Sequence, residues 1–214
     1  MAFYPINIDL KDKLCVVIGG GNVAERKVRG LVSFGASVRV VSPGLTEGLS
    51  ELARSNRIEH VARGYLEGDL EGALLVFAAS DDSRVNEAVC KEAAREGMLV
   101  NVADRPDLCS FIVPSIVKRG DLVLSVSTSG AFPLLAGKLK RELEEVYGPE
   151  YGRYLVALSE ARRELKKTGK GDREKLAALL DAELLALAKA GKDEELRERI
   201  TERGHRSRSQ NRSR

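Results

Sequence analysis

Hydrophobic runs alternate with amphipathic stretches along the first hundred residues. Five segments predict strands, namely 14–18, 37–42, 57–62, 73–79 and 98–102, and those at 14–18 and 73–79 are apolar throughout. Three stretches between them predict helices, namely 22–35, 45–56 and 83–96, and the first has apolar or small residues at helical spacing. Runs that are apolar throughout are typical of strands covered by helices on both faces. The order therefore predicts an α/β fold built on a Rossmann-like parallel sheet.

The pattern changes after this region. Segments 111–118 and 122–127 predict two strands around a tight turn, and Pro114 inside the first indicates an edge or bulged strand. Helical patterns follow at 134–146, 150–167, 172–190 and 193–203, with Gly169–Gly171 as a break. The second half of the chain is therefore expected to be mainly helical.

The composition indicates an ordinary folded protein and argues against a membrane or secreted one. The chain has 214 residues, of which 43% are hydrophobic and 31% charged, as in ordinary folded domains. No apolar run has the length of a membrane span, and the N-terminus lacks the pattern of a secretory signal. We therefore expect a cytoplasmic protein with no membrane partner.

The numbers of cysteines, histidines and charged residues limit which metal sites, disulfides and partners are expected. The three cysteines form no CxxC pair and there are two histidines, so neither a disulfide framework nor a metal site is expected. The net charge is +3, and the last ten residues hold four arginines and no acid. The net positive charge therefore comes from this tail, residues 205–214. We expect the tail to be disordered. No nucleic-acid partner is expected.

A glycine-rich turn follows the first predicted strand. Residues 19–24, GGGNVA, fit G-x-G-x-x-A where a strand meets a helix. Gly19 permits the tight turn, Gly21 lets the backbone approach a pyrophosphate, and Asn22 and Val23 offer free amides at the helix start. This predicts a dinucleotide site, and the alternative is a glycine-rich turn without a ligand.

The usual ribose-binding acid is missing. The second predicted strand ends at Ser42 and Pro43, with no Asp or Glu there, so the fingerprint alone leaves NAD and NADP open. The Ser42 hydroxyl or backbone groups could hold a ribose. Ala79 and Ser80 end the fourth predicted strand on the same edge and are expected beside the nucleotide.

Two further segments carry candidate chemistry. Asp104 follows the fifth predicted strand and is either a general acid or base, or the cap of a turn before Pro106. Ser127, Thr128 and Ser129 precede a predicted helix, so they either bind an anion or cap the helix. Arg105 and Lys138 suit an acidic substrate, and a solvated face is the alternative.

Three long segments carry a resemblance to a known family. They are YPINIDLKDKLCVVIGGGNVAERKVRGLVSFGASVRVVSP, FAASDDSRVNEAV and LVNVADRPDLCSFIVPSIVKRGDLVLSVSTSGAFPLLA. Together they resemble the precorrin-2 dehydrogenases, the siroheme-synthase N-terminal family, over about residues 3–165. The combination is far more specific than the dinucleotide fingerprint.

The resemblance implies an activity. Family members oxidise precorrin-2, a tetrapyrrole, to sirohydrochlorin with NAD as hydride acceptor, and some also insert ferrous iron. The aspartate of the family's N-V-x-D segment corresponds to Asp104, which implies a catalytic role. Some relatives have Ser-Ser-Gly-Gly where this chain has Ser127–Gly130, so a serine role transfers to no single hydroxyl. The alternative function is an NAD-binding regulatory or sensor module without catalysis.

The resemblance also implies an architecture. It predicts a homodimer with a Rossmann NAD-binding domain at 1–110 and a dimerisation segment, a β-hairpin plus a helix, at 111–147. A helical domain at 148–204 and the basic tail at 205–214 complete the predicted chain.

Overall fold

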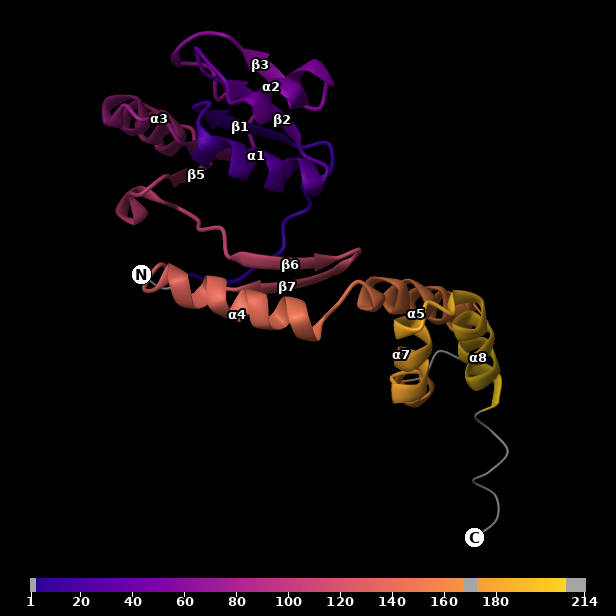
Figure 1. Cartoon of the computed structure of the whole chain (residues 1–214). Helices are drawn as coiled ribbons and strands as arrows, with labels where there is room; N and C mark the ends of the chain where they lie inside the picture. The colour runs from indigo at the N-terminus through magenta and orange to yellow at the C-terminus, as the bar shows by residue number, and fades with distance from the viewer. Residues whose placement is uncertain (1–2, 168–172, 207–214) are drawn as a thin grey trace. The chain divides into compact units, whose positions relative to one another are not determined.

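The computed structural model describes residues 3–167 and 173–206. The chain divides into two compact units, Met1–Val113 and Pro114–Arg214 (Figure 1). No helix in the described ranges is both long and apolar enough to cross a bilayer.

The first unit is a five-stranded parallel sheet in the order β3-β2-β1-β4-β5. Its strands are β1 Leu14–Ile18, β2 Ser37–Val41, β3 Glu59–Val61, β4 Leu75–Ala78 and β5 Leu99–Val102. Its helices are α1 Asn22–Ser33, α2 Glu47–Arg54 and α3 Ser83–Arg95, followed by the short 3₁₀ turn η1, Pro106–Leu108. This order confirms the predicted α/β fold.

Helices cover both faces of the sheet because its central strands alternate their side chains between two apolar layers. Cys15 and Val17 of β1 pack with α1 and α2, whereas Val16 and Ile18 pack with α3. All four side chains are buried, as expected for a strand that is apolar throughout. The core thereby fixes the sheet and the loops at its carboxyl edge.

The strands predicted at 57–62 and 73–79 are each three residues longer than the observed ones. β3 begins at Glu59 rather than at residue 57, because the Arg57 amide donates to Leu52 O (2.9 Å) and closes the end of α2. β4 covers Leu75–Ala78 instead of 73–79, because the Ala73 amide closes a turn on Leu70 O (3.0 Å).

The second unit begins with a hairpin of β6, Ser115–Arg119, and β7, Leu122–Val126, against which α4, Pro133–Val146, packs. Pro114 lies before β6 rather than inside a strand. Proline has no amide hydrogen to donate to a ladder, so the strand starts after it.

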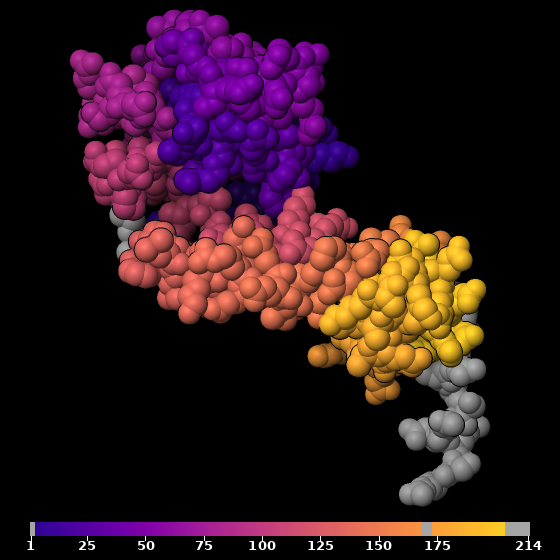
Figure 2. Space-filling view, in the orientation of Figure 1, coloured from indigo at the N-terminus to yellow at the C-terminus, as the bar shows by residue number. Residues whose placement is uncertain are grey.

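Four further helices complete this unit: α5 Glu150–Lys167, α6 Arg173–Ala177, α7 Ala182–Lys189 and α8 Asp193–Arg206. Their apolar side chains form a separate core, and the helices lie as a compact cluster in the space-filling view (Figure 2).

The prediction of one helix over 172–190 is wrong. The Tyr154 hydroxyl donates to Leu179 O (2.6 Å) and accepts from the Asp181 amide (3.2 Å). The Asp181 carboxylate then accepts from the Glu183 amide (2.7 Å) and caps a new helix, α7. These contacts end α6 and begin α7.

The C-terminal end also differs from the expectation. The helix expected at 193–203 continues through Arg206, so the tail predicted as disordered at 205–214 begins inside α8. Residues 207–214, and the break expected at Gly169–Gly171, lie outside the described residues.

Candidate functional site

The carboxyl ends of four parallel strands meet at one edge of the sheet. The Gly19 amide after β1 donates to Val41 O at the end of β2 (3.0 Å). The Ala79 amide after β4 donates to Ile18 O (2.8 Å), and the Ala103 amide after β5 donates to Ala78 O (2.8 Å). The turn residues predicted from these four strands are therefore brought together at one edge, where open α/β sheets bind ligands.

The three glycines after β1 serve different purposes. Gly19 has φ +121°, and a Cβ there would lie 2.2 Å from Ala79 O. A Cβ on Gly20 would lie 1.9 Å from Gly44 O, whereas one on Gly21 would meet nothing within 4 Å. Gly19 and Gly20 thus let the turns approach each other, and Gly21 faces open space. The sequence fingerprint gives no role to Gly20.

The N-terminus of α1 has free amides. Its N-cap, Gly21, makes no side-chain cap hydrogen bond, whereas Thr46 caps α2 and Asp82 caps α3. The amides of Asn22 and Val23 lie in this uncapped first turn, at the positive end of the helix dipole. The open space at Gly21 and these amides suit the pyrophosphate of a dinucleotide.

The loop after β2 is held by one hydrogen bond within the loop and one from β3. The Ser42 hydroxyl donates to Gly44 O (2.8 Å), and His60 Nε2 donates to Ser42 O (2.9 Å). Ser42 is buried and the adjacent Pro43 is exposed. Arg39, two residues before the end of β2, forms an ion pair with Glu59 (2.9 Å).

The loop after β4 is fixed by an asparagine on α3. The Ser80 amide donates to Asn86 Oδ1 (3.1 Å), and Asn86 Nδ2 donates back to Ser80 O (2.8 Å). The Ser80 hydroxyl accepts from the Asp82 amide (3.2 Å), and Ala79 before it is half-buried. This hydrogen-bonded loop lies directly beside the glycine turn, since a Cβ on Gly19 would meet Ala79 O.

Asp104 lies in the turn after β5 with an exposed side chain. Its φ of +58° is in the left-handed region, which Asp tolerates better than most residues. Within the described residues, its carboxylate accepts no hydrogen bond, and the N-cap of η1 is Arg105, which makes no side-chain cap bond. The carboxylate is therefore available for chemistry rather than used as a turn cap.

Cys109 and Ser110 hold this turn in place. Cys109 Sγ lies 3.2 Å from Val102 N, 3.3 Å from Val102 O and 3.3 Å from Arg105 O. The Val100 amide donates to Ser110 Oγ (2.8 Å), which ties the returning chain to β5. Burial raises the pKa of the Cys109 thiol, so it stays protonated. Spacing alone gives no signal for this role.

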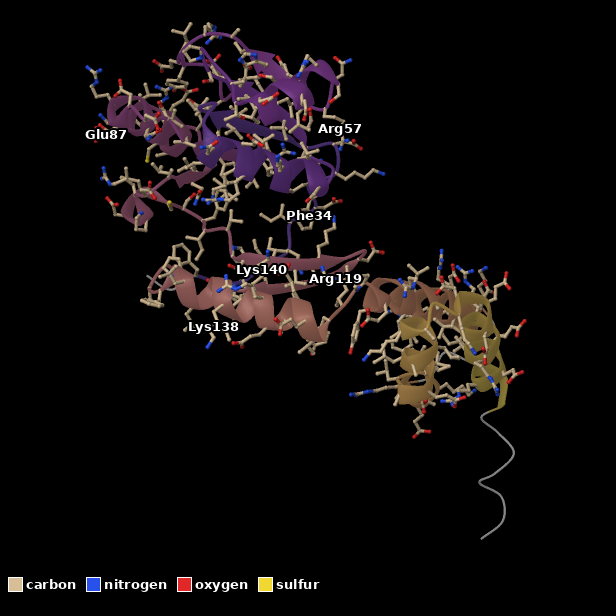
Figure 3. The ribbon with its side chains drawn as sticks, viewed as in Figure 1. Phe34, Arg57, Glu87, Arg119, Lys138 and Lys140 are labelled. Atoms are coloured by element: carbon tan, nitrogen blue, oxygen red, sulfur yellow. The ribbon has the colours of Figure 1, made fainter. Side chains whose placement is uncertain are left out.

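Two cationic side chains lie close to Asp104, and they differ in their partners. Arg105 pairs with Asp107 (2.8 Å) and lies 4.0 Å from Glu87, whose side chain extends from α3 (Figure 3). Lys27 of α1 is half-buried, with Nζ 5.6 Å from the centroid of the Phe77 ring. The sequence pattern singled out Arg105 and not Lys27, because the Lys27 environment depends on residues far along the chain.

The other predicted residues belong to the second unit. The Ser127 hydroxyl accepts from the Ser129 amide (3.0 Å), and the Thr128 hydroxyl accepts from the Phe132 amide at the start of α4 (3.3 Å). Lys138 extends outward from α4 and lies 3.6 Å from Glu142 (Figure 3). The Ser127 and Thr128 hydroxyls thus accept local backbone hydrogen bonds.

No group of three or more His, Cys, Asp or Glu side chains within the described ranges could hold a metal ion.

Comparisons with known proteins agree with this geometry. Residues 6–115 match a family described as "Putative NAD(P)-binding". The siroheme synthase of Methylobacillus flagellatus is 44% identical over 167 residues, covering 78% of this chain and 36% of that protein. That of Thioalkalivibrio sulfidiphilus is 42% identical over 163 residues, covering 76% and 33%. The chain thus spans about a third of the length of these curated relatives.

A solved structure matches nearly the whole chain. It is "SirC, precorrin-2 dehydrogenase", with 28% identity, a TM-score of 0.74, and coverage of 94% of this chain and 100% of that one. The resemblance seen in the sequence is therefore confirmed in both sequence and fold. The chain belongs to the NAD(P)-binding family matched by residues 6–115, with siroheme synthases and a precorrin-2 dehydrogenase among its relatives.

Proposed function

We propose that this chain oxidises precorrin-2 to sirohydrochlorin with NAD. The observation that carries the proposal is the edge shared by two features: the uncapped N-terminus of α1 and the unpaired carboxylate of Asp104. The α1 N-terminus would bind a phosphate of the dinucleotide, and the Asp104 carboxylate would accept a proton. The likeness to SirC over all of that chain supports the same reaction.

The dinucleotide would be held by backbone groups. Gly19, Gly21, Asn22 and Val23 would bind the pyrophosphate, and Ser42 with Pro43 would lie against a ribose, beside Ala79 and Ser80. Bound NAD supplies the hydride acceptor. NAD is favoured over NADP because the Arg39 guanidinium is paired with Glu59 (2.9 Å) and is not free for a 2′-phosphate.

Asp104 would act as the base. The oxidation breaks a C–H bond whose electron pair leaves as hydride, and a second hydrogen leaves as a proton. An exposed, unpaired carboxylate can accept that proton. The turn bonds of Cys109 and Ser110 would keep the carboxylate in position through the reaction.

The substrate carries acidic side chains, so cations and hydroxyls would bind them. Arg105, Ser127, Thr128, Ser129 and Lys138 are the candidates from the sequence. Arg105 would contribute less than a free guanidinium because Asp107 already neutralises it (2.8 Å). Ferrous iron would be a second substrate, inserted after the oxidation.

We also propose that the chain is a homodimer formed through α4. This helix exposes Leu134 (77%), Leu135 (43%) and Val146 (59%). Exposed apolar side chains gathered on one helix indicate an interaction surface, and a second copy that covered them would remove this apolar area from water. Sedimentation should give a dimer for the wild type and a monomer for Leu134→Glu combined with Leu135→Glu.

Each of the four predicted domains would then have its own role. Residues 1–110 would bind NAD, 111–147 would carry the dimer contacts, 148–204 would add a helical domain, and 205–214 would form a tail. The cytoplasmic location stays a prediction.

The test is anaerobic incubation of the full chain with precorrin-2 and NAD, followed by ferrous iron. NAD-dependent formation of sirohydrochlorin is the expected result, and an iron-dependent change faster than without protein would add the chelatase. A folded protein that binds NAD and forms no sirohydrochlorin would instead be the sensor module.

A further inference from the structure

Lys27 is a half-buried lysine at the edge of the candidate site. It lies on α1 between Ala24 and Val28, both of which are fully buried against the sheet. Its Nζ lies 5.6 Å from the centroid of Phe77, whose ring is itself 2% exposed. The lysine therefore extends over the apolar face of β4 rather than into free solvent.

The ammonium has no acceptor in the described parts of the chain, 3–167 and 173–206. It makes no hydrogen bond and no ion pair there, and its one contact of this kind is the Phe77 ring. Three other helix lysines differ, since Lys138, Lys140 and Lys192 each lie within 3.6 Å of a glutamate. Burying part of an ammonium group without an acceptor costs free energy. An anion that bound here would therefore accept charge-assisted hydrogen bonds that no protein group takes up.

The charges around Lys27 point to the same edge. Burial lowers the pKa of Lys27, and the neighbouring Arg26 lowers it further, while Cys109 and Asp104 raise it. Lys27 is thus close enough to Asp104 for their charges to interact. An anion bound to Lys27 would lie beside the carboxylate assigned to the proton transfer.

We propose that the Lys27 ammonium binds a carboxylate of the tetrapyrrole substrate and so positions the macrocycle beside Asp104. This inference rests on the proposed function, because it takes its ligand from that reaction. Lys27 is a substrate-binding residue in this account, and the proton goes to Asp104.

A substrate carboxylate fits Lys27 better than the dinucleotide pyrophosphate does. The free amides for the pyrophosphate are at Gly21–Val23, and Lys27 lies five residues after Asn22, roughly 7.5 Å further along the helix axis. Its neighbours Phe77 and Asp104 belong to the β4 and β5 side of the sheet, where the reacting end of the substrate would lie.

The test is a fluorescence titration of the full chain with uroporphyrin, a stable porphyrin with eight carboxylates. Lys27→Met should raise the Kd about tenfold or more, because a charge-assisted hydrogen bond is lost. Lys27→Arg should stay within about threefold of wild type, since the positive charge is kept. The matched control is Lys91→Met, an exposed lysine on α3, which should leave the Kd unchanged.

NAD affinity and thermal unfolding are measured on the same variants. We expect NAD affinity to be unchanged in Lys27→Met, and the KM for precorrin-2 to rise more than kcat falls. If Lys27→Met unfolds early, Lys27→Gln replaces it. Equal porphyrin affinity in wild type and Lys27→Met, or weaker NAD binding with unchanged porphyrin binding, would overturn the proposal.

The two proposals fail separately. A wild-type chain that binds uroporphyrin through Lys27 but forms no sirohydrochlorin would remove the dehydrogenase and leave the carboxylate site. A chain that forms sirohydrochlorin with equal KM in wild type and Lys27→Met would keep the dehydrogenase and remove the carboxylate site.

Discussion

Gly20 and Gly44 lie in backbone contact, so that a Cβ on Gly20 would come 1.9 Å from the Gly44 carbonyl oxygen. The Gly20 carbonyl also accepts from the Thr46 amide (3.0 Å) at the start of α2. Gly20→Ala should therefore destabilise the fold by about 1–3 kcal/mol, as overpacking does. Urea unfolding measures the loss, and a Gly20→Ala variant as stable as wild type would contradict this contact.

Gly21→Ala tests the neighbouring position. A Cβ on Gly21 meets nothing within 4 Å, so the fold should be retained. The added methyl group would stand where the pyrophosphate approaches the free amides, and NAD affinity should fall about tenfold. Isothermal titration with NAD measures it. Full NAD affinity in Gly21→Ala would mean that the cofactor does not approach this turn.

Asp104→Asn removes the charge and keeps the shape. Asn also tolerates the φ of +58° at this position, so the turn should persist. Loss of a general base should lower kcat about 10²–10⁴-fold. NAD binding and thermal unfolding are the controls, and both should match wild type. Near wild-type turnover in a folded Asp104→Asn variant would exclude this carboxylate from the chemistry.

The Tyr65 hydroxyl donates to the buried carboxylate of Glu92, which also accepts from the Gly68 amide (3.0 Å). Tyr65→Phe leaves one acceptor position of Glu92 unsatisfied and should cost about 1–3 kcal/mol at neutral pH. Urea unfolding of both proteins measures the difference.

The same pair predicts a pH dependence. Burial, followed by the hydrogen bond to Glu92, raises the pKa of Tyr65 above its ordinary value. The folded protein therefore holds this proton more tightly than the unfolded chain does. The advantage of wild type over Tyr65→Phe should be constant below pH ~10 and shrink as the pH rises further. An advantage that grows above pH ~10 would contradict the bond.

Local patterns explain why so much of the first unit was predictable. The apolar run of β1, the glycines and the periodic α1 follow one another directly in the sequence, and each leaves a local signal. Asp104 could likewise be placed at the sheet edge, because it follows a strand that pairs in parallel with β4.

The remaining features depend on contacts between distant residues. The break between α6 and α7 is made by Tyr154, which lies 25 positions before Leu179. Gly20 gains its role from Gly44, and Lys27 gains its burial from Phe77. Such pairings have no fixed spacing, so no sequence pattern indicates them.

The central claim is that one hydride and one proton leave precorrin-2 at the edge formed by α1 and the Asp104 turn. The most direct measurement is an anaerobic incubation with precorrin-2 and NAD, in which NADH and sirohydrochlorin are quantified together. The account predicts equal amounts of the two from wild type, and formation of both that is about 10²-fold slower or more with Asp104→Asn. Sirohydrochlorin without matching NADH, or equal yields from both proteins, would contradict it.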